Sequence, residues 1–195
     1  MIVTRGRVVA LSLLGLAWVL GGCAQISNVT TPSSVAPSAS ASPSVVPTTR
    51  PTAPGRPASA SERTPAGAAE FVRYWFATLA YATGSGDVGP FAAASADECR
   101  TCRAAVEAVQ QSYADGGRLD GGDYSLQDVT PSVLASDGLI SVAVVFDRSP
   151  RSALSPVGEV RGSLPGVAFV QCEVRVAWVE KAWKVRALQT ETPLV

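Results

Sequence analysis

The sequence predicts an α+β domain in which two to three N-terminal helices pack on a curved antiparallel sheet of about four to five strands. Three observations support this fold class. Apolar residues recur at helical spacing in two segments after residue 64, and they alternate with polar residues at 167–179. Helical segments followed by a run of strands are typical of α+β domains. Composition divides the 195-residue chain into residues 1–22, residues 23–64 and this domain at 65–195.

Residues 1–22 have the features of a secretory leader. Arg5 and Arg7 precede an uncharged apolar stretch at 8–20, which is shorter than the ~20 residues that a membrane-spanning helix requires. The leader ends in Leu-Gly-Gly-Cys at 20–23, which resembles the lipobox of bacterial lipoproteins. The resemblance implies that Cys23 is the lipidation site and becomes the mature N-terminus, on the extracytoplasmic face of the cell membrane. The alternative is a general secretory signal that leaves Cys23 unmodified.

The segment that follows Cys23 reads as a tether. Pro, Ser, Thr and Ala make up 29 of the 41 residues at 24–64, with one acidic residue and no aromatic residue. Such a segment buries too little apolar surface to offset the entropy of ordering. We therefore expect residues 23–64 to be a lipidated cysteine followed by a disordered linker.

Charge limits the classes of partner. Residues 65–195 carry 11 basic and 15 acidic side chains, a net charge of −4. Nucleic-acid binding requires clustered Lys and Arg, so this balance excludes nucleic acid as an expected partner. The expected partners are a membrane, through the lipid anchor, and either a small apolar ligand or an envelope protein.

The first helix is predicted to begin at Thr64-Pro65, a capping hydroxyl followed by proline at the first helical position. It is predicted to end at Gly84-Ser85-Gly86, and a short helix is expected at 89–94. Its predicted buried face consists of apolar residues at helical spacing, namely Ala68, Phe71, Val72, Trp75, Phe76, Leu79 and Ala80.

A further helix is predicted from an N-cap at Asp97 to about residue 114, with Cys99 and Cys102 on its apolar face. A glycine-rich connection is expected at 116–123. Strands are then predicted at 124–130, at 139–146 with both faces covered, at 167–179 with Cys172 facing the core, and at 183–189 after a tight turn. Residues 147–166 contain three prolines and are expected to form a long excursion.

This order of elements, with an aromatic first helix and a closing hairpin between Trp178 and Trp183, resembles the cone-shaped fold of nuclear transport factor 2. Ketosteroid isomerase and SnoaL-type polyketide cyclases share that fold. Phe-Val-Arg-Tyr-Trp-Phe at 71–76, Cys-Arg-Thr-Cys at 99–102 and Tyr-Ala-Asp-Gly-Gly at 113–117 resemble a group of actinobacterial lipoproteins, over roughly residues 65–190. Their shared domain has no assigned function.

The resemblance implies a cone that is open at one end and holds a ligand pocket. The candidate lining residues are Trp75, Phe76, Trp178 and Trp183. The alternative is that these aromatic side chains form the hydrophobic core.

The residue types limit the chemistry. The chain has no histidine, which excludes Ser-His-Asp and Cys-His nucleophilic sites and histidine-containing zinc sites. The acidic and tyrosine residues that serve ketosteroid isomerase cannot be placed here, because the core-facing strand positions are apolar. We therefore expect a non-catalytic binding or interaction module, with no metal and no cofactor besides the lipid on Cys23. The alternatives are a pocket enzyme of the cone-shaped fold and a thiol–disulfide exchanger that uses Cys99 and Cys102.

Three thiols remain if Cys23 is lipidated, so at most one intramolecular disulfide forms. The pairs are Cys99–Cys102, Cys99–Cys172 and Cys102–Cys172. Cysteines three positions apart on a helix lie within disulfide reach, and export to an oxidising compartment favours a structural bridge. We predict that Cys99 and Cys102 are joined and that Cys172 is a buried thiol.

The first testable prediction concerns the anchor. Replacing Cys23 with Ala removes the thiol that would carry the diacylglycerol, so lipid incorporation should be lost and the protein should be released or stalled in export. Metabolic labelling with a fatty-acid analogue and membrane fractionation measure both effects. Unchanged membrane retention of the variant would contradict the lipobox.

Overall fold

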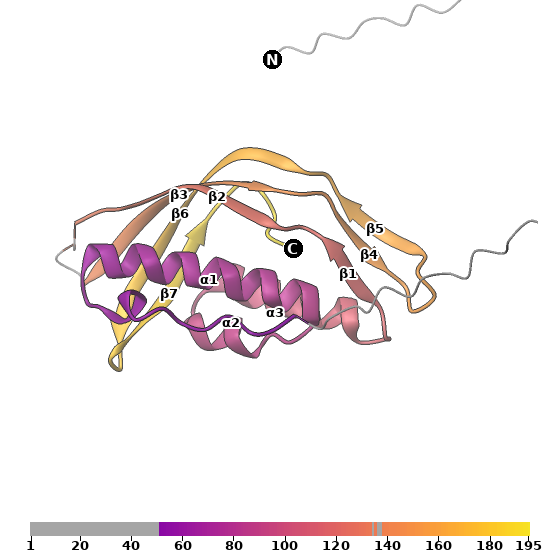
Figure 1. Cartoon of the computed structure of the whole chain (residues 1–195), viewed down its shortest axis with the longest axis horizontal. Helices are drawn as coiled ribbons and strands as arrows, with labels where there is room; N and C mark the ends of the chain where they lie inside the picture. Colours follow the sequence, from indigo (N-terminus) through magenta and orange to yellow (C-terminus); the bar gives the residue numbers. More distant parts are fainter. Residues whose placement is uncertain (1–50, 134, 136–137) are drawn as a thin grey trace, which may run out of the picture. The chain divides into compact units, whose positions relative to one another are not determined.

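The fold is α+β and combines three α-helices with two antiparallel sheets (Figure 1). The computed structural model describes residues 51–133, 135 and 138–195. The leader, Cys23 and residues 24–50 of the predicted tether therefore lie outside the described residues. The elements are a 3₁₀ turn η1 (Ser59–Ser61), α1 (Pro65–Ser85), α2 (Gly89–Ala94), α3 (Arg100–Tyr113), β1 (Arg118–Gly121), β2 (Tyr124–Pro131), β3 (Leu139–Arg148), β4 (Arg151–Leu154), β5 (Val160–Leu164), β6 (Val167–Val179) and β7 (Ala182–Gln189).

The sheets contain more strands than the sequence predicted. The described residues form seven strands, in the orders β1-β4-β5 and β2-β3-β6-β7. Strand β1 lies in the expected glycine-rich connection, and β4 and β5 form a hairpin within the expected excursion at 147–166. The three prolines lie between the strands, which leaves the intervening residues free to pair.

The chain crosses between the two sheets three times, from β1 to β2, from β3 to β4 and from β5 to β6. Each crossing is a gap of two residues between consecutive strands. The gaps are at residues 122–123, 149–150 and 165–166. Backbone bonds tie two of these gaps together, since Gly122 N donates to the Pro150 carbonyl (3.0 Å) and Ser149 N donates to the Asp123 carbonyl (3.0 Å). The chain therefore passes from one sheet to the other along a shared bend, over the helices (Figure 1).

Two glycines make this bend sterically feasible. Gly121 and Gly122 have φ of 73° and 85°, a region that L side chains disfavour. A Cβ on Gly121 would lie 2.2 Å from the Pro150 carbonyl oxygen, and one on Gly122 would lie 2.0 Å from Arg151 Nε. Glycine is therefore required both by the backbone conformation and by the close approach of neighbouring atoms.

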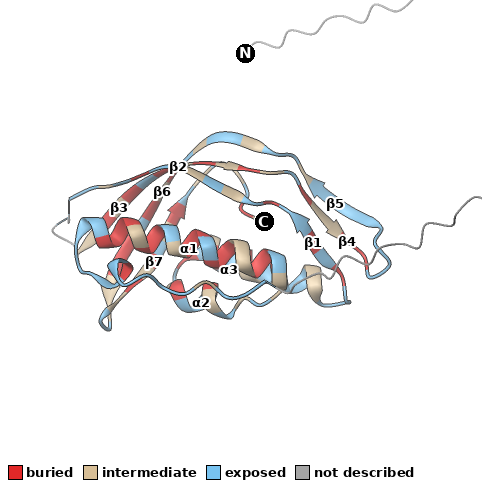
Figure 2. Cartoon of the chain, in the orientation of Figure 1, coloured by how far each residue is buried: buried red, intermediate tan, exposed pale blue. Residues whose placement is uncertain are grey.

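Helix α1 has the predicted boundaries and the predicted buried face. Thr64 Oγ1 accepts a hydrogen bond from Gly67 N (3.0 Å), and the helix ends at Gly86 in the left-handed conformation, with φ of 78°. Phe71 and Leu79 are among its fully buried residues. The buried side of α1 faces the four-stranded sheet, and the opposite side of the helix is exposed (Figure 2).

The inner face of the four-stranded sheet supplies the other half of the core. Antiparallel pairing of β3 and β6 brings together the buried pairs Ile140–Val176, Val142–Val174 and Val144–Cys172. The alternation predicted for 167–179 holds at these central positions. At the strand ends Ala168 is exposed and Trp178 is half-buried; beside Ala168 the register with β3 shifts and Phe169 has positive φ, which interrupts the alternation.

Strand β3 differs from the prediction that both of its faces are covered. Its residues alternate between buried and more accessible positions, and Ala143 is exposed. The helices cover only one face of this sheet (Figure 2), so the apolar residues of β3 on the other face remain accessible.

Helix α3 begins later than predicted. Its N-cap is Cys99 rather than Asp97, and it ends at Tyr113. Ser95 and Ala96 pair with strand β7, since Ala96 N donates to the Val185 carbonyl (2.8 Å), and Asp97 and Glu98 then form a turn closed by Cys99 N and the Ala96 carbonyl (2.9 Å). This tertiary contact delays the first helical turn.

The ordered domain also begins earlier than the predicted boundary at residue 65. Ala60 is fully buried, and Trp183 Nε1 donates to the Glu62 carbonyl (2.8 Å). The Arg56 guanidinium lies 5.2 Å from the ring centroids of Phe71 and Tyr74. Residues 56–64 thus pack on α1 and β7 instead of belonging to a free tether.

Two glycines of α1 test this packing. A Cβ on Gly67 would lie 2.1 Å from the Glu62 carbonyl oxygen, whereas one on Gly84 would meet only the Pro51 ring at 3.7 Å. Gly67→Ala should destabilise the protein by about 1–3 kcal/mol through overpacking. Gly84→Ala, the matched control, should leave stability unchanged or raise it by up to about 1 kcal/mol. Denaturant unfolding measures both, and equal effects of the two variants would contradict the packing of residues 56–64 on α1.

Candidate functional site

The aromatic side chains proposed as pocket lining lie in the core instead. Trp75 and Trp183 are 0% exposed and Phe76 is 2% exposed, while Trp178 is half-buried and contacts the Trp183 ring edge-on at 5.1 Å. The Trp75 ring lies 5.0 Å from Phe91. Aromatic contacts of this kind fill the space between α1 and the four-stranded sheet.

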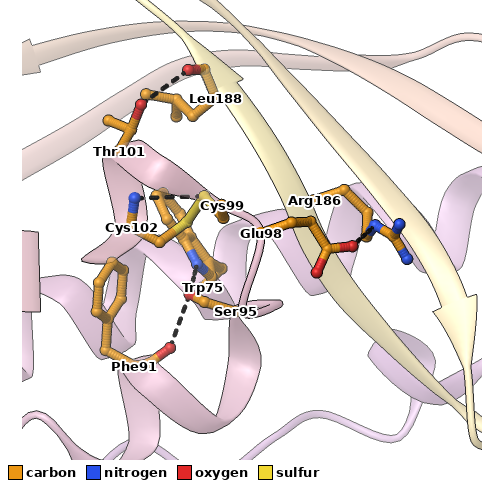
Figure 3. The surroundings of a disulfide bond; sticks show 9 residues. All are labelled: Trp75, Phe91, Ser95, Glu98, Cys99, Thr101, Cys102, Arg186 and Leu188. Atoms are coloured by element: carbon orange, nitrogen blue, oxygen red, sulfur yellow. Dashed lines mark hydrogen bonds and ion pairs between the residues drawn. A yellow bond between two sulfur atoms is a disulfide. The ribbon is translucent and has the colours of Figure 1, made fainter. Parts of the chain in front are cut away.

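The polar atoms of this aromatic core are satisfied within the protein. Trp75 Nε1 donates to Ser95 Oγ (2.9 Å), and Ser95 Oγ donates to the Phe91 carbonyl (2.9 Å), as Figure 3 shows. Because the N–H groups of Trp75 and Trp183 bind protein acceptors, they offer no hydrogen bond to a ligand.

The predicted disulfide between Cys99 and Cys102 is confirmed. Their Cα atoms are 5.2 Å apart, and the two residues are 0% and 1% exposed. The segment that they close runs along β7 (Figure 3). Thr101 Oγ1 donates to the Leu188 carbonyl (3.2 Å), and Glu98 pairs with Arg186. The bridge therefore fixes the segment that covers the β7 edge, and its sulfur atoms are shielded from an exchange partner.

Cys172 is the remaining thiol of the described residues, and it lies on β6 facing the core. Burial raises the pKa of its thiol to about 11. The thiol is therefore protonated and unreactive at neutral pH.

Two buried arginines form a group that the sequence analysis did not identify. Arg148 and Arg151 flank the bend and are each 3% exposed. Arg148 donates to the carbonyls of Pro193 (3.1 Å) and Pro165 (3.0 Å). Arg151 donates to the carbonyls of Leu194 (2.8 Å) and Gly122 (3.0 Å). The sequence offered no periodic signal for them, because Arg-Ser-Pro-Arg at 148–151 reads as a solvated turn.

The charges of this arginine pair are not neutralised by a carboxylate contact. Within the residues that the structure describes, neither guanidinium forms an ion pair, and the Nε atoms of both are buried without a hydrogen-bond partner. Burial lowers the pKa of Arg151, an effect that neighbouring Tyr124 partly offsets. Burial also raises the pKa of Tyr124, whose hydroxyl donates to the Leu194 carbonyl (2.6 Å).

A pocket of about 300 Å³ adjoins Arg151. It lies between α3 and the three-stranded sheet, away from the tryptophans that the sequence suggested as lining. Its lining is mostly small and apolar, with two hydroxyl groups, and comprises Ala108, Ser112, Leu119, Arg151, Ala153, Gly162, Ser163, Leu164 and Val195.

A second depression, of about 800 Å³, lies between the first half of β6 and residues 188–192. Strand β7 pairs with β6 only from Glu173 onward, so residues 167–172 have an open strand edge on that side. Phe169 lies on this edge, is 75% exposed and has φ of 54°. Its N–H donates to Asp147 Oδ1 (2.8 Å) on the other side of the strand. We call this region the β6 edge groove.

The described residues contain no grouping of three or more His, Cys, Asp or Glu side chains that would hold a metal ion. Over the same residues, no helix is both long and apolar enough to cross a membrane.

Fold and site together define an α+β domain with an aromatic core, a buried disulfide, and surface depressions that include the β6 edge groove and the pocket beside Arg151. The chain belongs to the family of unknown function DUF6318, whose model matches residues 46–189. No curated protein matches it.

The solved structures that are similar to the chain include two of low sequence identity. The intermembrane-space region of the chloroplast protein ARC6 is 18% identical, with a TM-score of 0.43, over 64% of this chain and 93% of that one. The protein Aln2 from a Streptomyces species is 17% identical, with a TM-score of 0.39, over 60% of this chain and 84% of that one.

Cys172 yields a prediction with a defined pH range. Since burial favours the neutral thiol, this group stabilises the fold fully below its ordinary pKa of about 8.5. It loses that contribution as the pH rises towards about 11. Stability measured against pH should therefore fall more steeply between these limits for the natural protein than for Cys172→Ser.

Alkylation provides the companion measurement. Iodoacetamide should modify Cys172 at neutral pH only after unfolding, while Cys99 and Cys102 stay linked in non-reduced peptide maps. Rapid labelling of all three thiols in the folded protein would contradict both assignments.

Proposed function

We propose that the chain is a lipid-anchored, non-catalytic interaction module on the extracytoplasmic face of the cell membrane. In this proposal it binds an extended segment of an envelope protein in the β6 edge groove. The observation that carries the proposal is the exposed Phe169 beside the open edge of β6.

The anchor part rests on the sequence. A charged, short apolar leader that ends in Leu-Gly-Gly-Cys supports lipidation of Cys23. A diacylglyceryl group provides the two acyl chains that stable anchoring requires. Residues 24–50 then supply a Pro/Ser/Thr/Ala-rich linker that carries the domain away from the lipid surface.

The finer fold assignment is also a proposal. Three helices followed by a bent antiparallel sheet support the cone-shaped fold of nuclear transport factor 2 and SnoaL-type cyclases. In this chain, aromatic side chains fill the space between α1 and the four-stranded sheet, which disfavours a pocket enzyme that works there. The burial of Cys99 and Cys102 disfavours the thiol–disulfide exchanger.

Open strand edges bind polypeptides because their unpaired N–H and C=O groups can extend the sheet with a new strand. Proteins usually protect such edges with charges, prolines or covering segments. Here β7 leaves β6 after Gln189, and the β6 edge groove separates the two chain segments. A bound extended segment would lie about 4.8 Å from β6, the usual spacing of neighbouring strands, and would then occupy this groove.

Phe169 supplies the apolar anchor for such a segment. Aromatic residues carry much of the energy of protein interfaces. A phenylalanine with positive φ has a conformational cost, and strained residues concentrate at functional sites. Phe169 lines the β6 edge groove, and in this proposal the strained backbone holds its ring where a bound segment would contact it.

Site-specific crosslinking in intact cells tests the proposal. A photoreactive amino acid in place of Gln171, which lines the β6 edge groove, should form an adduct that maps to one short stretch of one envelope protein. Phe169→Asp should reduce the adduct at least tenfold. Val157→Asp also introduces an aspartate, but at an exposed valine of the β4–β5 turn, and it should leave the adduct unchanged.

Three outcomes would overturn the proposal. An adduct between two copies of this chain would replace the envelope partner with self-association. Equal loss of the adduct in the two aspartate variants would show a nonspecific effect of charge. The absence of any mapped adduct, with the protein retained in the membrane, would remove the groove as a binding site.

A further inference from the structure

We infer that the pocket beside Arg151 binds a small monoanionic ligand with a short apolar chain, of the carboxylate class, independently of the β6 edge groove. Arg151 would hold the anionic group, and the apolar lining from α3, β1, β4 and β5 would hold the chain.

The first argument is charge. Transferring a guanidinium out of water costs several kcal/mol, even after the protein relaxes, unless an opposite charge compensates it. Arg148 and Arg151 are buried side by side at the bend and receive backbone carbonyls in place of a carboxylate. The titratable groups that act on Arg151 are Tyr124, whose hydroxyl is neutral, Arg148 and the exposed Asp123. A bound anion would supply the missing negative charge.

The second argument is the set of unused donors. A guanidinium has five N–H groups in a planar fork that matches a carboxylate. Each terminal nitrogen of Arg151 gives one N–H to a carbonyl, of Leu194 and of Gly122, and keeps a second N–H, while Nε is buried against Gly122. The Ser163 hydroxyl lines the same pocket and can donate to the second carboxylate oxygen, whereas the Ser112 hydroxyl donates to the Ala108 carbonyl (2.8 Å).

The third argument is shape. Ligand pockets in proteins begin at about 300 Å³, which is the volume found here. Leu119, Ala153 and Leu164 provide an apolar wall. A pocket of this size and lining suits a carboxylate with a short aliphatic chain better than a multiply charged phosphate ester, which would leave charge against apolar side chains.

The competing explanation is that the arginines only clamp the bend and residues 193–194. That role accounts for the four hydrogen bonds to carbonyls. It does not account for the pocket next to Arg151.

The test measures thermal unfolding of the full mature chain in a non-ionic detergent, with hexanoate as the probe. Hexanoate should raise Tm saturably, by about 4 °C or more at concentrations well above its Kd. Hexanamide has the same chain length without the charge and controls for effects on the detergent; it should give no shift. An equal shift with hexanamide, or with inorganic phosphate, would overturn the proposed anionic and apolar recognition.

A pair of variants on α3 separates binding from clamping. Ala108→Phe fills the pocket while leaving both arginines in place, so it should abolish the hexanoate shift. Ala104 lies one turn away on the same helix, is exposed and does not line the pocket, so Ala104→Phe should keep the shift. Both variants should retain the Tm of the unliganded protein within a few degrees.

Arg151→Lys keeps the positive charge but removes the planar guanidinium that can bind both carboxylate oxygens. It should weaken hexanoate binding at least tenfold. If this variant does not fold, the α3 pair decides the question alone. A hexanoate shift that survives Ala108→Phe, or the absence of any shift in the natural chain, would reduce the arginine pair to a structural clamp.

Discussion

The structure depends on one bend, at which the chain passes between the two sheets from β1 to β2, from β3 to β4 and from β5 to β6. Arg148 and Arg151 flank this bend in the central strand, and their guanidinium groups bind carbonyls of all the chain segments that meet there. Gly121 and Gly122 allow the backbone to approach Pro150 and Arg151 closely enough for these contacts. The bend divides the antiparallel strands into two sheets, and it also brings a buried positive charge to the wall of a pocket. One constraint therefore determines both the architecture and the electrostatics of the domain.

The helices use the two sheets differently. Helix α1 packs its aromatic face against the four-stranded sheet, and the Trp75 and Trp183 N–H groups find acceptors within the protein. Hydrogen bonds of Ala96 and Thr101 hold residues 95–101 against β7, where they cover one edge of that sheet, and the disulfide fixes residues 99–102. The start of β6 has no such cover, because β7 pairs with only part of it. The three-stranded sheet does not pack completely against α3, and the space between them is the pocket beside Arg151.

This distribution separates the aromatic core from the surfaces available for binding. Trp75 and Trp183 are buried in the core, and the disulfide between Cys99 and Cys102 is shielded from solvent. The two surfaces that we propose as functional lie where packing is incomplete, at the uncovered strand edge and beside the bend. They differ in chemistry, since one offers backbone hydrogen bonds and an aromatic anchor and the other offers a positive charge in an apolar pocket. The two can therefore be tested separately.

The sequence by itself determined the local elements whose signals are local. The Thr64 cap and the glycines at 84–86 set the limits of α1, and alternation identified β6 and its central inward residues. The spacing of Cys99 and Cys102 was enough to favour their pairing. The start of α3, strands β1, β4 and β5, and the packing of residues 56–64 depended on contacts with distant segments. Only the tertiary structure placed Arg148 and Arg151 in the interior, because a short Arg-Ser-Pro-Arg stretch carries no periodicity and its burial results from three chain segments that converge on it.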